Sequence, residues 1–180
     1  QRMAFTNKGY KPSLLVMSAT PIPRTLTLAA YGDMDETRIT EKPIGRLPIE
    51  TISISINKEK KLLERLKNKL NSNEKAYWVC PLIEESEELD LEAATERYKK
   101  LDKIFKNKVL LIHGQLKESE KELVMKKFKE EDYCLLVATT VIEVGIDIKE
   151  ATTLIVEHAE RFGLAQLHQL RGRVGRNNIQ

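Results

Sequence analysis

The chain has 180 residues, of which 41% are hydrophobic and 32% are charged, and its formal net charge is +3. This composition supplies enough apolar side chains for a core, and no run of about 18 apolar residues predicts a transmembrane helix. The small net charge does not predict nucleic-acid binding by itself. Residues 58–75 and 161–176 are basic and residues 84–92 are acidic, but such runs are more often solvated faces.

The first apolar run, residues 13–19, predicts a buried parallel strand. A helix is predicted from Pro23 to near Gly32, because the missing N–H of proline is unpaired in a first turn in any case. Ser18 and Thr20 therefore follow the carboxyl end of a strand, where open α/β sheets bind ligands. Their hydroxyl groups serve either a ligand or only the capping of the next helix.

Residues 40–48 contain two prolines and a glycine, which is typical of a linker. We therefore predict a domain boundary near residue 46. The chain is expected to hold residues 1–46 as the tail of one domain and residues 47–180 as most of a second domain.

Short apolar runs and amphipathic segments alternate after the linker. We expect strands at residues 49–56, 76–83, 109–112, 133–138 and 152–157. An acidic loop is expected to follow the second of these strands. Strands that alternate with helices of 10 to 15 residues predict βαβ units around a parallel sheet, so the fold class is α/β. Tyr77 and Trp78 are assigned to the core in preference to base stacking.

Three helices are expected between these strands. The first spans residues 58–70 and has its leucines on one face. The second has an apolar face that runs from Leu91 to Phe105. The third begins at Ser119 with Glu122 three residues later, a capping-box pattern. Its apolar face is expected to comprise Leu123, Val124 and Phe128.

The last stretch of the chain combines arginines and glycines at the end of an amphipathic segment. Apolar residues recur there at helical spacing, at Leu164, Leu167, Leu170 and Val174. Arginines alternate with glycines at Arg171, Gly172, Arg173, Gly175 and Arg176. Glycine lets the backbone approach a ligand closely, and guanidinium groups fit phosphate oxygens. The pattern favours phosphate binding over a merely solvated basic helix end.

Polar residues also follow two of the later strands. His113 and Gly114 follow one strand, and residues 139–147 follow the next with threonines, a glycine and an acid. Hydroxyl groups and free backbone N–H groups at a strand end can hold phosphates, and Asp147 could bind a ribose or orient an arginine.

Cys80 and Cys134 lie in apolar runs without a partner at metal-ligand spacing, which predicts buried free thiols. His158 and His168 are not spaced as ligands with either cysteine, so no metal site is expected. His168 is expected either to position Gln169 or to touch an acid across a cleft.

Three strings resemble motifs of superfamily 2 helicases. Met-Ser-Ala-Thr-Pro-Ile-Pro-Arg-Thr-Leu from Met17 resembles the third motif, and Ala-Thr-Thr-Val-Ile-Glu-Val-Gly-Ile-Asp from Ala138 resembles the fifth. Gln-Leu-Arg-Gly-Arg-Val-Gly-Arg from Gln169 resembles the sixth. Together with Val79-Cys-Pro-Leu-Ile-Glu-Glu-Ser-Glu and other strings, they are similar to the bacterial branch-migrating DNA helicases over essentially the whole chain.

The resemblance implies a RecA-like second motor domain and a role for each motif residue. Residues implied in catalysis at the γ-phosphate of ATP are Gln169, Arg173 and Arg176. Residues implied in nucleotide binding and coupling are Ser18, Thr20, Gly145 and Asp147. Residues implied in contact with the DNA strand are His113, Gly114, Thr139 and Thr140.

The chain contains neither a Gly-x-x-x-x-Gly-Lys-[Ser/Thr] phosphate loop nor an acidic Asp-Glu magnesium motif. By the resemblance, ATP and Mg²⁺ are held mainly by a first RecA-like domain, and branched DNA is engaged with a wedge domain. We therefore expect a piece of a cytoplasmic, nucleoid-associated bacterial ATP-dependent DNA helicase that remodels stalled forks and Holliday junctions. This piece should not hydrolyse ATP alone. The alternatives are a transcription-repair coupling translocase and a non-catalytic nucleic-acid-binding module.

Overall fold

The fold is taken from a computed structural model that describes Thr37, Ile39 and residues 48–81, 87–139, 148 and 150–175. The chain divides into two compact units, Gln1–Arg38 and Ile39–Gln180, and nearly all described residues belong to the second. The boundary near residue 46 stays a prediction. The strand expected at residues 13–19 and the helix expected after Pro23 lie outside the described residues.

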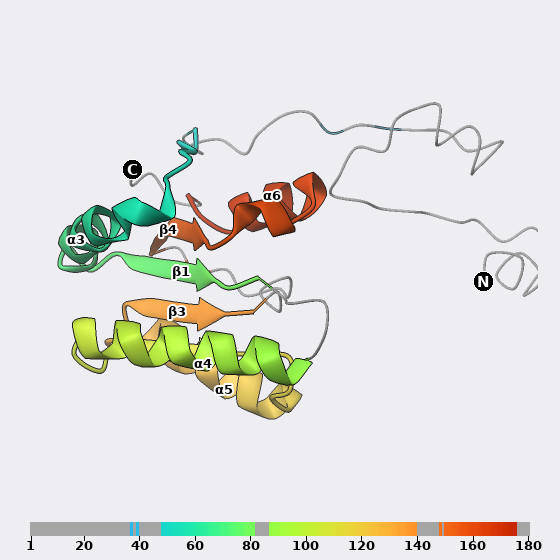
Figure 1. Cartoon of the computed structure of the whole chain (residues 1–180). Helices are drawn as coiled ribbons and strands as arrows, with labels where there is room; N and C mark the ends of the chain where they lie inside the picture. The colour runs from blue at the N-terminus through green and yellow to red at the C-terminus, as the bar shows by residue number, and fades with distance from the viewer. Residues whose placement is uncertain are drawn as a thin grey trace, which may run out of the picture. The chain divides into compact units, whose positions relative to one another are not determined.

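A parallel sheet forms the centre of the second unit (Figure 1). Its strands are β1 (Lys75–Val79), β2 (Val109–Ile112), β3 (Leu135–Ala138) and β4 (Ala151–Val156). Their order across the sheet is β2-β3-β1-β4, and every pair of neighbours is parallel. The expected α/β class with a parallel sheet is confirmed.

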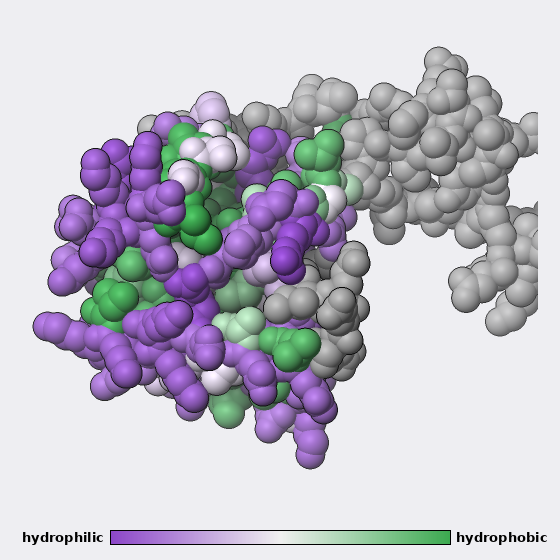
Figure 2. All heavy atoms as spheres, in the orientation of Figure 1, coloured by the Kyte–Doolittle hydropathy of each residue, from purple (hydrophilic) through white to green (hydrophobic). Residues whose placement is uncertain are grey.

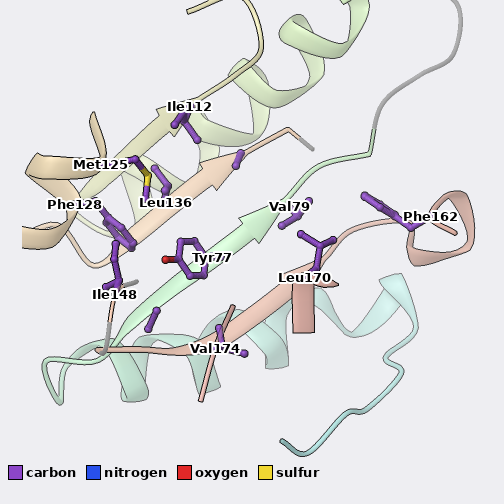
Figure 3. Close-up of a cluster of buried hydrophobic side chains, with 12 residues drawn as sticks. Tyr77, Val79, Ile112, Met125, Phe128, Leu136, Ile148, Phe162, Leu170 and Val174 are labelled. Carbon is purple, nitrogen blue, oxygen red and sulfur yellow. The ribbon is translucent and has the colours of Figure 1, made fainter. Parts of the chain in front are cut away.

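Helices cover both faces of this sheet. They are α3 (Glu59–Leu70), α4 (Glu87–Ile104), α5 (Glu118–Glu130) and α6 (Leu164–Arg171), with two short 3₁₀ helices, η1 (Ile56–Lys58) and η3 (Ala159–Arg161). Buried residues of α3 and α4 share one core cluster with the sheet. Buried residues of α5 and α6 share the other (Figure 3).

Strand β1 shows why the sheet has two cores. Ala76 and Trp78 belong to the core under α3 and α4, whereas Tyr77 and Val79 belong to the core under α5 and α6. Successive side chains of a strand point to opposite faces, so an uninterrupted apolar strand fills both layers. Tyr77 and Trp78 are 1% and 3% exposed, which confirms their assignment to the core.

The prediction of a strand at residues 49–56 is wrong. Residues 48–55 form no helix or strand, and η1 begins at Ile56. Ile52 and Ile56 are 59% and 61% exposed. Alternating β-branched residues favour a strand only where a sheet edge pairs with them, and none of the described strands pairs with this segment.

Two helix ends also differ from the sequence expectation. Helix α4 begins at Glu87, inside the acidic stretch that was expected to be a loop. Acidic side chains are favourable in a first turn because they face the positive end of the helix dipole. Helix α5 begins two residues earlier than expected, after Lys117 and not at Ser119. The carboxylate of Glu120 accepts a hydrogen bond from the backbone N–H of Lys117 at 2.8 Å. Glu120, and not the expected Glu122, therefore caps the helix.

Two expected core leucines are exposed. Leu123 on α5 is 55% exposed, and Met125 takes the buried position in its place. Leu164 opens α6 and is 86% exposed. The described residues over the helix layers in Figure 2 are mostly hydrophilic, with smaller apolar patches between them. Every helix in the described part of the chain is too short or too polar to cross a membrane.

Candidate functional site

The carboxyl ends of the four strands form one row along an edge of the sheet. Thr139 N–H donates to the carbonyl of Ile112 at 3.3 Å, and Cys80 N–H donates to the carbonyl of Ala138 at 2.8 Å. Glu157 N–H donates to the carbonyl of Val79 at 2.9 Å. The first residues after β2, β3, β1 and β4 therefore lie next to one another, as parallel pairing requires.

This row brings His113 beside Thr139. Ile112 and Ala138 are register partners, and the two predicted DNA-binding residues follow them directly. Gly114 lies in the turn that leads to α5, where Leu116 N–H donates to the His113 carbonyl at 3.3 Å. Thr139 is only 3% exposed. The DNA contact of His113, Gly114 and Thr139 stays a prediction.

The His113 imidazole is held in its neutral form. Burial lowers the His113 pKa from its usual 6.5, with a smaller raising effect of Glu120 and a smaller lowering effect of Lys121. Nδ1 of His113 is buried and has no hydrogen-bond partner among the described residues. At neutral pH this side chain therefore offers a hydrogen bond and no positive charge to a phosphate.

The arginine-rich end of the chain is anchored by two apolar side chains. Leu170 and Val174 are 5% and 2% exposed and belong to the core under α5 and α6 (Figure 3). Arg173, which lies between them in the chain, is half-buried and has interactions of its own, whereas Gln169 is exposed. The anchors fix the backbone that carries Arg173.

Two glycines let this end adopt its path. Gly175 has a φ of +66°, and an added Cβ would lie 3.1 Å from Cγ1 of Ile49. At Gly172, an added Cβ would lie 3.1 Å from the carbonyl oxygen of Gln169. Side chains would therefore be crowded at both positions, and at Gly175 the backbone itself favours glycine.

Within the described part of the chain, no hydrogen bond or ion pair joins the His168 side chain to an acid or to Gln169. Nδ1 of His168 lies 3.1 Å from Nη2 of Arg171. Because a guanidinium can only donate, Arg171 is the donor and His168 Nδ1 the acceptor in this contact. Arg171 and His168 thus form a pair on the exposed side of α6.

The predicted residues do not all lie at one edge. Gly175 N–H donates to the carbonyl of Ala151 at 3.4 Å, and Ala151 begins β4. The arginine-rich end is therefore at the amino-terminal edge of the sheet, whereas His113 and Thr139 are at the carboxyl edge. The predicted residues Ser18, Thr20, Thr140, Gly145, Asp147 and Arg176 lie outside the described residues.

A partly buried ionic cluster at the carboxyl edge was not predicted from the sequence. The Glu157 carboxylate accepts from Trp78 Nε1 at 3.0 Å and from Arg97 Nε at 3.0 Å. Nη2 of Arg97 also pairs with Glu157, and Nη1 pairs with Glu59. Nothing local marks these residues, although an acid placed directly after an apolar strand is a signal that could have found Glu157.

The cluster also sets the chemistry of Cys80. Burial, together with the negative charge of Glu157, raises the pKa of the Cys80 thiol to about 12. This thiol therefore stays protonated at neutral pH and is a poor nucleophile. Cys134 is a half-buried free thiol, and burial raises its pKa as well. The expected free thiols are confirmed, with Cys134 less buried than expected.

Comparison with known proteins identifies the family. Residues 57–178 match the family model of the helicase conserved C-terminal domain, so the chain belongs to this family. It is 52% identical over 172 residues to the ATP-dependent DNA helicase RecG of Aquifex aeolicus, covering 95% of this chain and 22% of that protein. It is 46% identical over 185 residues to the RecG of Escherichia coli strain K12, covering 99% and 27%. The chain thus spans about a quarter of the length of these relatives.

A solved structure supports the fold. The chain resembles the Saccharomyces cerevisiae protein Dbp5 bound to RNA and ADP BeF3, with a TM-score of 0.62 at 19% identity, over 91% of this chain and 42% of that one. At this identity the likeness concerns the fold alone. It agrees with the RecA-like parallel sheet expected from the motif resemblance.

Proposed function

We propose that the chain is the second motor domain of an ATP-dependent DNA helicase that remodels branched DNA, preceded by the tail of a first motor domain. The similarity to RecG helicases at 46–52% identity over nearly the whole chain supports this proposal. The relatives are about four times longer, and we place the phosphate loop and the Mg²⁺-binding acids in the remainder of the longer protein. The isolated chain is then inactive as an ATPase.

The observation that carries the proposal is the anchored arginine-rich end of α6. Leu170 and Val174 hold this end in the core, and the glycine at position 175 removes the side chain that would collide with Ile49. Arg173 is thereby held half-buried on a fixed backbone. Its guanidinium has the charge and planar donor geometry that fit an ATP γ-phosphate.

Arg173 and Arg176 are proposed to stabilise the charge that develops during phosphoryl transfer, with ATP supplying the phosphoryl group. Gln169 lies one helical turn before Arg173, and we propose that it helps to orient the reacting groups. Ser18, Thr20, Gly145 and Asp147 are proposed to contact the nucleotide or couple its state to domain closure. His113, Gly114, Thr139 and Thr140 are proposed to hold the DNA backbone.

The test is ATP turnover by the longer protein on forked DNA. An arginine that stabilises the transition state raises turnover by about a thousand- to a hundred-thousand-fold. Arg173→Ala and Arg176→Ala should each lower kcat by at least about a hundredfold and leave DNA binding intact. Arg171→Ala is the matched control, since this exposed arginine pairs with His168. Near-normal turnover in both variants would contradict the assignment of these arginines.

A further inference from the structure

The segment that leads into α3 is exposed to solvent and apolar. All of residues 50–58 except the isoleucines are polar or charged, and Ile52, Ile54 and Ile56 are 59%, 37% and 61% exposed. Figure 2 shows hydrophobic side chains on the surface at this segment, next to α3. Ile49 precedes the segment and packs against the core under α5 and α6, and α3 follows the segment. Both ends of the segment are therefore held on the domain while its isoleucines face solvent.

The backbone of this segment has free hydrogen-bonding groups. In the part of the chain that the structure describes, residues 50–54 make no backbone hydrogen bond. The Ser55 carbonyl accepts from Lys58 N–H at 2.9 Å within η1, and η1 buries no residue. Alternating β-branched residues with an unpaired backbone are a template for pairing with another strand.

The sequence of the segment is symmetric about Ile54. Isoleucines stand two positions before and two positions after it, and serines stand one position before and one position after it. Four positions away the charges are opposite, with Glu50 on one side and Lys58 on the other. Successive side chains of a strand alternate between its two faces, so an extended strand presents both charges and all three isoleucines on one face.

This symmetry matches that of an antiparallel strand pair made from two copies of the chain. When Ile54 lies opposite Ile54 of the second copy, Ile52 lies opposite Ile56 and Glu50 lies opposite Lys58. Directly opposite side chains are about 4.5–5.5 Å apart at Cβ, so the isoleucines pack together and the opposite charges pair. A shift by two residues sets an isoleucine opposite a charge, and a parallel in-register pair sets like charges opposite each other. The charges therefore select one register.

We propose that residues 51–57 are a self-association site, at which two copies of the chain pair as antiparallel strands about Ile54. The pairing straightens η1 and replaces its hydrogen bond by bonds between the strands. Specific stable interfaces bury about 1,200–2,000 Å², and three isoleucines from each copy supply only part of this area. The dimer is therefore weak and its population depends on protein concentration. This inference does not rest on the proposed function.

Sedimentation velocity of the 180-residue chain over about two orders of magnitude in concentration measures the association. We expect a concentration-dependent shift from monomer to dimer. Ile54→Lys should lower the association constant by about tenfold or more, because it sets two like charges opposite each other at the two-fold axis. The matched control is Leu164→Lys, which replaces a leucine that is 86% exposed outside the segment and should leave the association constant unchanged.

An exchange of charges tests the register. Glu50→Lys alone and Lys58→Glu alone each set like charges opposite each other at both ends of the pair, and each should weaken the dimer by about threefold or more. The variant with both substitutions restores the two pairs of opposite charge and should restore the original association constant. Lys60→Glu, which makes the same change of charge on the exposed side of α3, is the control. Circular dichroism checks that each variant is folded.

A chain that stays monomeric over the whole concentration range overturns the inference, and so does growth beyond a dimer. Association that survives Ile54→Lys, or that the double exchange fails to restore, also overturns it, because another surface or register then makes the contact.

The alternative occupant of the segment is a strand from the rest of the longer protein. Hydrogen exchange of the longer protein at low concentration detects this case. Protection of residues 51–57 in the monomer would place a strand of the same polypeptide there and would overturn the inference. ATP turnover on forked DNA is a separate measurement, so the proposed function stands or fails independently of these outcomes.

Discussion

Removal of the Glu157 carboxylate is the most informative single perturbation of this fold. Glu157→Ala deletes the acceptor of four hydrogen bonds, two from Arg97, one from Trp78 Nε1 and a long one from Cys80 Sγ. It leaves a partly buried guanidinium with Glu59 as its remaining ionic partner and a buried indole N–H without an acceptor. The variant therefore tests whether the ionic cluster holds the ends of β1 and β4 to α4.

The expected loss can be bounded from the geometry. Breaking a fully buried ion pair by removing one partner costs about 3–5 kcal/mol. The low end of this range applies here, because about 15% of the Arg97 and Glu157 side chains is still exposed and Glu59 remains as an ionic partner of Arg97. We expect Glu157→Ala to lower the free energy of unfolding by about 3 kcal/mol. With an m-value of about 2 kcal/mol/M, the urea midpoint should fall by about 1.5 M.

The assay is urea unfolding followed by far-UV circular dichroism, because the emission of Trp78 itself responds to the substitution. Glu160→Ala is the matched control: this exposed carboxylate pairs with the His158 ring and interacts electrostatically with Arg161, and its loss should leave the midpoint nearly unchanged. In a double-mutant cycle with Arg97→Met, the two substitutions should be coupled by about 1–3 kcal/mol. A midpoint shift below about 0.3 M, or no coupling energy between the two substitutions, would refute the idea that the ionic cluster holds β1 and β4 to α4.

Three further predictions concern single side chains elsewhere. Gly175→Ala should destabilise the domain by about 1–3 kcal/mol in thermal unfolding, because Gly175 has a positive φ and Ile49 lies close to it. The control is Gly163→Ala, where an added Cβ would meet no atom nearer than 3.8 Å, and it should change the stability by less than about 0.5 kcal/mol. Burial lowers the His113 pKa, so the unfolded chain binds a proton at this imidazole more readily than the folded chain does. The free energy of unfolding should therefore fall as the pH drops below 6.5, and His113→Gln should remove this part of the pH dependence. In thiol labelling at neutral pH, the half-buried Cys134 should react before Cys80, which should react only on unfolding; equal rates would contradict the burial of Cys80.

The sequence alone determined the regular part of the fold. The strand at residues 109–112 was predicted with its observed bounds, because a short apolar run between polar turns has few other outcomes. The face of α3 was predicted as well: Leu66 and Leu70 are buried as the helical spacing requires. The arginine-glycine string at residues 169–176 could also be found from the sequence, because it is a contiguous pattern of residues.

Where the sequence expectation failed, the deciding contact was distant in the chain. Residues 49–56 have the alternation of a strand but pair with none of the described strands. Leu164 has the right helical spacing, yet it opens α6 where nothing covers it, and it is 86% exposed. Periodicity predicts which side chains share a face of an element, but not whether another element packs on that face.

The sites divide in the same way. The sequence named Arg173, His113 and Thr139 as candidates, but only the tertiary structure placed the arginine at one edge of the sheet and the other two at the opposite edge. Glu59, Arg97 and Glu157 are 38 and 60 residues apart along the chain, and no spacing rule links them. Their cluster exists because parallel strand order brings the ends of β1 and β4 together under α4, where partly buried charges are stabilised by ionic partners.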